Sequence, residues 1–187
     1  MKAGREELME IVDLWGYSKD AQEKILAILE SEDVPPPHLF RYYGPNEGHG
    51  KVWQAERLFE ETLGTPYALA VNSGTSALMS AAAAAGIGPG MEVIVPGYTF
   101  FASASIIVAS RAIPVIAEID DSLNLDADDV ERRITPQTGA IVVVHMKGMP
   151  AQMDRIMEIA RKHDLIVIED VAQACGGSFG GKKLGTI

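Results

Sequence analysis

The fold is decided by one stretch, Leu165-Ile166-Val167-Ile168-Glu169-Asp170-Val171-Ala172-Gln173. It begins as a short apolar run rich in β-branched residues, which predicts a strand buried on both faces of a sheet. The run ends in two carboxylates. A carboxylate at the carboxyl end of a buried parallel strand lies where open α/β sheets bind their ligands. We therefore interpret Asp170 as the partner of a heterocyclic nitrogen in a bound cofactor.

Strand-like and helix-like segments alternate before this stretch. The pattern predicts strands over 67–71, 92–95, 114–119, 140–145 and 165–169, separated by helices over 77–85, 100–110, 126–134 and 151–163. Strands joined by helices imply right-handed crossovers and parallel pairing. The expected fold class is therefore α/β, with a mainly parallel sheet and helices on both faces. The glycine-rich residues 176–187 predict a hairpin or a loop.

The first 50 residues are expected to form an N-terminal helical and interface segment, followed by a larger domain over 51–187. Apolar residues at helical spacing predict a helix over 5–15 and a second helix that starts at an Asp20 N-cap and ends before three consecutive prolines. Residues 38–50 either line a pocket, reach a neighbouring subunit or form an ordered surface loop. A further helix is predicted over 52–63, with Gly64 as its C-cap.

Composition excludes several classes of protein. The chain has 187 residues, of which 47% are hydrophobic, enough for one sizeable α/β core. Its formal net charge of -10, without a basic stripe, argues against a nucleic-acid partner. The only cysteine, Cys175, excludes an internal disulfide and a cysteine-based zinc site, and we expect no metal. No apolar run is long enough for a membrane span and no signal region opens the chain, so we expect a cytoplasmic protein.

The segment Asn72-Ser73-Gly74-Thr75-Ser76 follows a predicted strand and opens a predicted helix. A helix N-terminus presents unpaired N–H groups and a positive dipole end, which suit a phosphate. Gly74 allows close approach of the backbone to an anion, and Thr75 and Ser76 add hydroxyl donors. The alternative is ordinary N-capping. A nucleotide site is disfavoured, because the glycines at 86–90 lead into a strand rather than a helix.

Two further elements belong at the same edge of the sheet. Phe100 follows the strand at 92–95, where an aromatic ring can stack on a planar ligand, although taken alone it fits the core. Asp170 beside a pyridine nitrogen keeps that nitrogen protonated, and Gln173 is close enough in sequence to reach the ring substituents. The alternative for Asp170 is that it caps the turn or pairs with a lysine.

Together these stretches resemble the DegT/DnrJ/EryC1/StrS family of pyridoxal-phosphate-dependent sugar aminotransferases. The resemblance covers residues 50 to 187 and rests on Asn72-Ser73-Gly74-Thr75-Ser76-Ala77-Leu78, on Glu92–Pro96 with Thr99-Phe100, and on Glu169-Asp170-Val171-Ala172-Gln173-Ala174. It implies the large, pyridoxal 5'-phosphate-binding domain of the fold-type-I (aspartate aminotransferase-like) architecture over 51–187, incomplete at its C-terminus. The stretch at 144–154 also resembles members that act on keto-deoxy-octulosonate sugars and on inosose.

The resemblance assigns a role to each candidate residue. Thr75 and Ser76, with Gly74, would bind the cofactor phosphate, Phe100 would stack on the pyridine ring, Asp170 would pair with its nitrogen, and Gln173 would lie near its 3-hydroxyl. The catalytic residue stays unknown. None of the lysines fits the place of the family's Schiff-base lysine, which we expect outside this chain.

The resemblance also implies the activity, namely transfer of an amino group from an amino acid, glutamate or glutamine, to a keto or aldehyde sugar. We expect a homodimer or assembly with a complementary chain, and association of the isolated chain. Three alternatives stay open. The chain is one subunit of a two-chain enzyme, a pyridoxal-phosphate-dependent sugar dehydratase, or a non-catalytic module that binds a phosphorylated ligand.

Overall fold

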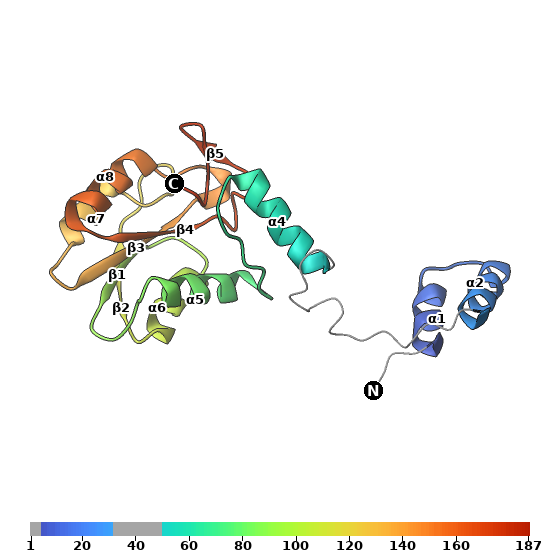
Figure 1. Ribbon diagram of the computed structural model, residues 1–187. Coiled ribbons are helices and arrows are strands. Elements are labelled where there is room, and N and C mark those ends of the chain that lie inside the picture. The colour runs from blue at the N-terminus through green and yellow to red at the C-terminus, as the bar shows by residue number, and fades with distance from the viewer. Residues whose placement is uncertain (1–4, 32–49) are drawn as a thin grey trace. The chain divides into compact units, whose positions relative to one another are not determined.

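The computed structural model describes residues 5–31 and 50–187 (Figure 1). Contacts divide the chain into two compact units, Met1–Ala55 and Glu56–Ile187. Between Gly50 and Ile187 the elements are α4 (Lys51–Leu63), α5 (Gly74–Ala84), β1 (Glu92–Pro96), α6 (Ala102–Ala109), β2 (Ile113–Ala117), α7 (Ala127–Arg133), β3 (Thr138–Val144), the 3-10 turn η1 (Met146–Gly148), α8 (Met153–His163), β4 (Ile166–Asp170), β5 (Ser178–Phe179) and β6 (Lys182–Lys183). No helix in the two described ranges has both the length and the apolar character that a membrane crossing requires.

The N-terminal unit contains α1 (Arg5–Leu14) and α2 (Lys19–Ser31). The two predicted helices are confirmed. The side chains of their apolar faces are only partly buried, namely Met9, Val12, Ile25, Leu26 and Leu29. The turn between them places Gly16 at a φ of 73°, a conformation that glycine adopts without strain. The predictions for residues 38–49 lie outside the described residues.

The prediction that Asp20 is the N-cap of the second helix is wrong. The helix begins at Lys19, and the hydroxyl of Ser18 accepts the N–H of Ala21 at 3.3 Å. Asp20 lies in the first turn instead, where it pairs with Lys24 at 2.7 Å. Ser and Asp cap helices about equally well, so their spacing in the sequence did not separate the two.

Four parallel strands form the central sheet in the order β2-β1-β3-β4. The predicted parallel α/β fold is therefore confirmed. After β1 the chain adds β2 along one edge of β1, and it then crosses back to add β3 along the other edge. This reversal of direction makes the position between β1 and β3 a topological switch point. Ligands of open α/β sheets bind outside the carboxyl ends of the strands at such a point. Val144 and Asp170 pair at that end of β3 and β4.

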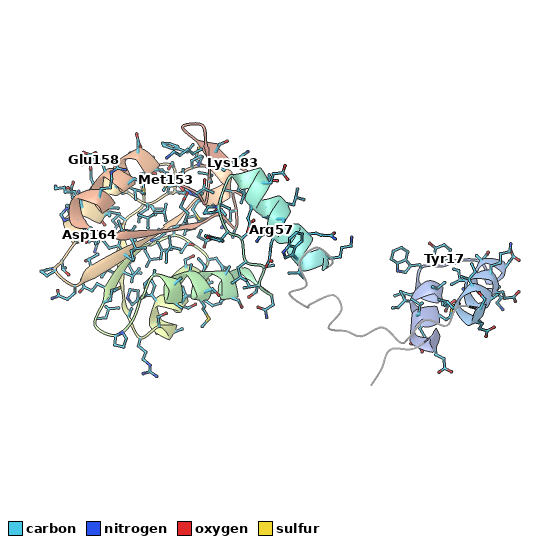
Figure 2. The ribbon with its side chains drawn as sticks, viewed as in Figure 1. Tyr17, Arg57, Met153, Glu158, Asp164 and Lys183 are labelled. Carbon is cyan, nitrogen blue, oxygen red and sulfur yellow. The ribbon has the colours of Figure 1, made fainter. Side chains whose placement is uncertain are left out.

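Helices cover both faces of the sheet, α5 and α6 on one and α7 and α8 on the other (Figure 1). Successive side chains of a strand point to opposite faces. Val93 and Val95 accordingly join the α5–α6 core, whereas Ile94 between them joins the α7–α8 core. In Figure 2 the labelled Met153 belongs to this second core and is fully buried, while Glu158 of the same helix lies at the surface.

The predicted strand over 67–71 is not formed. This segment follows α4 without a strand partner, and two of its N–H groups donate to α4 side chains. The N–H of Ala68 binds Glu60 Oε1 at 3.0 Å, and the N–H of Ala70 binds Glu56 Oε1 at 2.8 Å. These carboxylates thus accept hydrogen bonds from backbone N–H groups that would otherwise donate to the carbonyls of a neighbouring strand. Tyr67 and Leu69 remain 83% and 75% exposed.

The glycine-rich residues after β4 form a hairpin, one of the two predicted possibilities. β5 and β6 pair antiparallel across Gly180 and Gly181, whose φ angles are 56° and 82°. Two residues with positive φ give the turn that matches the twist of a two-stranded hairpin. The chain then returns to the sheet, where Leu184 is buried.

Candidate active site

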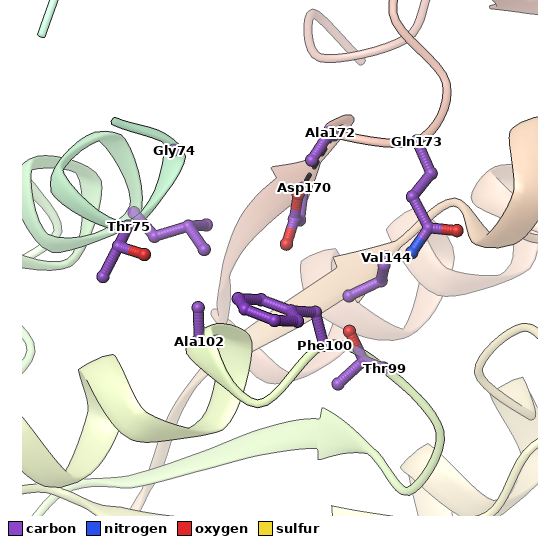
Figure 3. Close-up of a pocket in the computed structure, with 10 residues that line it drawn as sticks. Gly74, Thr75, Thr99, Phe100, Ala102, Val144, Asp170, Ala172 and Gln173 are labelled. Atoms are coloured by element: carbon purple, nitrogen blue, oxygen red, sulfur yellow. Dashed lines mark hydrogen bonds between the residues drawn. The ribbon is translucent and has the colours of Figure 1, made fainter. Parts of the chain in front are cut away.

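A cavity of about 340 Å³ lies at the carboxyl edge of the sheet (Figure 3). It is lined by Gly74, Thr75, Leu78, Thr99, Phe100, Ala102, Val144, Asp170, Ala172 and Gln173. Five of the six candidate residues from the sequence are thus brought together from α5, from the loop after β1 and from the end of β4. Ser76, the sixth, does not line the cavity.

The N-terminus of α5 forms one wall of the cavity. Ser73 is the N-cap, with its hydroxyl accepting the N–H of Ser76 at 3.1 Å. The hydroxyl of Ser76 turns back to Asn72 Oδ1 at 2.7 Å. Ordinary capping therefore occurs, as the alternative held, yet the first N–H groups of a helix have no partner inside it. A Cβ added at Gly74 would meet no atom within 4 Å. The backbone at Gly74 is consequently open to an anion in the cavity.

Asp170 is held by donors from two directions. Its Oδ2 accepts the hydroxyl of Ser103 at 2.9 Å, and its Oδ1 accepts the N–H of Ala172 at 3.1 Å. The second bond is the turn cap that the sequence left open as an alternative. A carboxylate has about four acceptor sites, so two donors leave it able to bind a cationic group from the cavity.

Phe100 supplies an aromatic surface just before the N-terminus of α6. Its side chain is 60% exposed, so it is not a core residue. Its ring lies 4.5 Å from that of Phe101, between centroids, at an interplanar angle of 52°. Figure 3 shows the carboxylate of Asp170 directed toward the Phe100 ring. A planar group between them would stack on one and bond to the other.

Gln173 is oriented by the backbone of η1. Its Oε1 accepts the N–H of Lys147 at 2.9 Å, and Lys147 has a φ of 52°. Because the carbonyl is used in this bond, the amide NH₂ is the group left for a ligand. Figure 3 shows the nitrogen on the side of Val144 and the oxygen turned away from it. Gln173 therefore offers a donor to the cavity.

Two polar residues of the site were missed in the sequence. Ser103 is fully buried, and Thr99 lies within 3.1 Å of its hydroxyl. Thr99 belongs to a stretch that carries the resemblance but was given no role there. The only signal for Ser103 is the i,i+4 spacing of two hydroxyl residues around a helix start, which is too common to identify a site.

Among residues 5–31 and 50–187, no lysine lines the cavity, and Asp170 is the only lining side chain that carries a charge. Lys147 is exposed, and Lys183 donates to the carbonyl of Gly176 at 3.4 Å in the hairpin. Within the described residues, no three His, Cys, Asp or Glu side chains are placed to hold a metal ion.

Comparison with known proteins gives a consistent result. The model of the DegT/DnrJ/EryC1/StrS aminotransferase family matches residues 47–187. The chain is 47% identical to GDP-perosamine synthase of Caulobacter vibrioides over 73% of its own length and 37% of that protein. It is 47% identical to the L-glutamine:2-deoxy-scyllo-inosose aminotransferase of Streptomyces kanamyceticus over 76% of its length and 34% of that protein. The chain thus spans about a third of these curated relatives.

A solved structure with a similar fold is consistent with this family assignment. NtdA from Bacillus subtilis, with bound cofactor PMP, superimposes with a TM-score of 0.68 at 31% identity. The match covers 89% of this chain and 37% of that chain.

Proposed function

The chain belongs to the DegT/DnrJ/EryC1/StrS aminotransferase family, and from this premise we propose that its cavity binds pyridoxal 5'-phosphate for transfer of an amino group. The donor is an amino acid, glutamate or glutamine, and the acceptor is a keto or aldehyde sugar. One observation carries the proposal, namely that a helix N-terminus and the carboxylate of Asp170 line the same cavity. The first suits a phosphate and the second a protonated ring nitrogen, and this cofactor has both groups.

The lining residues fit the cofactor. A cavity of about 340 Å³ is within the usual range for small ligands. The open space at Gly74 admits a phosphate close to the α5 backbone, next to the hydroxyl of Thr75. Ser76 would reach the phosphate only by exchanging a present partner, since its hydroxyl is bonded to Asn72 and its N–H to Ser73. When bound, the cofactor supplies a protonated pyridine ring that accepts electrons from the carbon bearing the amino group.

The side chains of this chain bind and orient that ring. Asp170 holds a proton on the ring nitrogen, because the negative charge favours the cationic form. Phe100 covers one ring face and limits rotation of the ring within the cavity. Gln173 donates from its amide nitrogen to the ring oxygen, since its carbonyl already accepts the N–H of Lys147.

The Schiff-base lysine is proposed to come from outside this sequence, in a further segment or in another chain. The absence of any lysine among the lining residues supports this. A homodimer or a complementary chain is proposed as the assembly, supported by the exposed Leu58, Phe59, Tyr67 and Leu69. We also propose a cytoplasmic protein in which residues 51–187 are the cofactor domain and residues 1–50 an interface segment.

Binding of pyridoxamine 5'-phosphate tests the proposal directly, because this form of the cofactor needs no lysine for its retention. Wild-type protein is expected to bind it, and Asp170→Asn to bind it at least about tenfold more weakly, since the variant loses a charged partner of the ring nitrogen. Asp164→Asn is the matched control, an exposed aspartate at the end of α8 whose left-handed φ of 55° also suits asparagine. Binding is measured by fluorescence titration.

Turnover is tested with the lysine-bearing segment or chain present. Amino transfer from glutamate or glutamine to a keto sugar is the expected reaction. Cofactor binding with dehydration of the sugar instead would contradict the proposed reaction while leaving the site intact. Wild-type protein that does not bind pyridoxamine 5'-phosphate would contradict the site itself.

A further inference from the structure

Two hydroxyl residues form a hydrogen-bonded chain that ends at Asp170. They are the buried Ser103 and the half-buried Thr99, which itself lines the cavity. Ser103, in the first turn of α6, is fully buried and does not line the cavity. Its Oγ lies 2.9 Å from Asp170 Oδ2 and 3.1 Å from Thr99 Oγ1. Ser103 and Asp170 are 67 positions apart in the chain. A helix that packs on the sheet therefore contributes a donor to the one charged side chain of the site.

The direction of these hydrogen bonds follows from counting protons. An ionised carboxylate only accepts, so the Ser103 hydroxyl must donate its single proton to Asp170. The oxygen of Ser103 can then only accept from Thr99, whose hydroxyl becomes the donor of the second bond. The chain Thr99 to Ser103 to Asp170 consequently runs in one direction. Hydrogen bonds linked in this way polarise one another and strengthen the last of them.

We propose that Ser103, oriented by Thr99, is a positioning residue that fixes the Asp170 carboxylate toward the ring nitrogen of the bound cofactor. The inference rests on the proposed cofactor and assigns to this chain a residue that acts through Asp170. The N–H of Ala172 holds one carboxylate oxygen and Ser103 holds the other. Two donors on different oxygens fix the rotation of the carboxylate about its Cβ–Cγ bond. The remaining acceptor sites then face the cavity.

Ser103→Ala is the first test, with pyridoxamine 5'-phosphate as the probe. Affinity is expected to fall about threefold to tenfold, the range for one lost bond to a charged group that is partly replaced by solvent. The ring nitrogen of the bound probe is expected to lose its proton at a pH lower by about half a unit to one unit. The pH titration of the probe's ultraviolet absorption measures this second effect, which a merely structural role would not move.

Two more variants make the test specific. Ser105→Ala is the matched control, because this half-buried serine of the same helix donates only to the Ala102 carbonyl, at 3.3 Å. It is expected to keep the wild-type affinity and titration. Thr99→Val keeps the side-chain shape and removes the donor to Ser103, and it is expected to move both readouts in the same direction by a smaller amount. If Ser103→Ala does not fold, the ring titration of Thr99→Val carries the test, because Thr99 lines the cavity and its removal can change affinity directly.

Each outcome either supports or overturns the positioning role of Ser103. Lower affinity and a lower ring titration in Ser103→Ala or Thr99→Val, with Ser105→Ala unchanged, support the positioning role. Wild-type readouts in the folded hydroxyl variants overturn it and leave the proposed function intact. Wild-type protein that fails to bind the probe overturns both.

Discussion

At the scale of single residues, Glu169 shows how the position before Asp170 is used. Its carboxylate lies on the opposite face of β4 and accepts three donors. His145 Nε2 lies 3.2 Å from Oε2, the N–H of Gly185 donates to the same oxygen at 2.9 Å, and the N–H of Ile187 donates to Oε1 at 2.7 Å. His145 Nδ1 accepts the N–H of Ala151 at 3.1 Å, so the ring proton is on Nε2 and points at Glu169. Glu169 thereby ties the residues after the hairpin to the sheet.

Glu169→Gln is expected to lower the free energy of unfolding by about 2 kcal/mol at pH 7, because an amide nitrogen would face one of these N–H donors. Burial works to raise the pKa of Glu169, but the bonds from His145, Gly185 and Ile187 outweigh it and the pKa is lowered from 4.5. A lowered carboxyl pKa stabilises the fold above the unfolded value and loses that effect as the pH falls. The difference between wild type and variant should therefore shrink below about pH 4.5.

Urea unfolding at pH 7 and at acidic pH measures this difference. Amide exchange at Gly185 and Ile187 should also be faster in the variant. Glu158→Gln on α8 is the control, since that side chain is 65% exposed and its ion pair with Arg155 lies at the surface. Equal stability of Glu169→Gln and wild type at neutral pH would contradict the anchoring role.

At the scale of elements, the strands at 92–96 and 67–71 show what local pattern can and cannot predict. Both are short apolar runs. Glu92–Pro96 becomes a strand because it has neighbours on both sides, β2 and β3. The run at 67–71 has no strand partner, and Glu60 and Glu56 accept the N–H groups of Ala68 and Ala70. A strand needs a partner as well as a pattern, and the partner is a tertiary property that the run itself does not contain.

The N-terminus of α5 is the element from which the phosphate site is built, and Ser73 is its cap. Ser73→Ala is expected to cost about 1 kcal/mol of stability. Because the N–H of Ser76 would lose its acceptor and the first turn would loosen, affinity for pyridoxamine 5'-phosphate should fall more than affinity for pyridoxamine, which has no phosphate.

The ratio of the two affinities is the measurement, taken by fluorescence titration on folded protein. Ser80→Ala is the control, an exposed serine in the same helix beyond its first turn. An unchanged ratio in Ser73→Ala would argue that the phosphate does not bind at this helix end.

At the scale of the whole molecule, the sequence predicted the layers of the fold but not the order of its strands. Alternating strands and helices required a parallel sheet with both faces covered. The order β2-β1-β3-β4 depends on which edge of β1 each later strand joins. The local periodicity of the sequence carries no information about that choice. The same limit applies to the site. Asp170, Phe100 and the α5 N-terminus had local signals, whereas Ser103 became recognisable only when α6 packed beside the end of β4.

The exposed apolar side chains of the larger unit predict that the chain associates. Leu58 and Phe59 of α4 are 62% and 51% exposed, and Tyr67 and Leu69 of the following segment are 83% and 75% exposed. Burying one such side chain contributes about 1.5–3 kcal/mol, so a few of them together favour association.

Sedimentation velocity over a range of concentrations should show the chain associating. Tyr67→Ser with Leu69→Ser should weaken this without loss of unfolding free energy, since neither side chain is in the core. Val108→Ser, on the exposed side of α6 at 60% exposure, is the control. A chain that stays monomeric at every concentration would show that this surface has no affinity for a second copy.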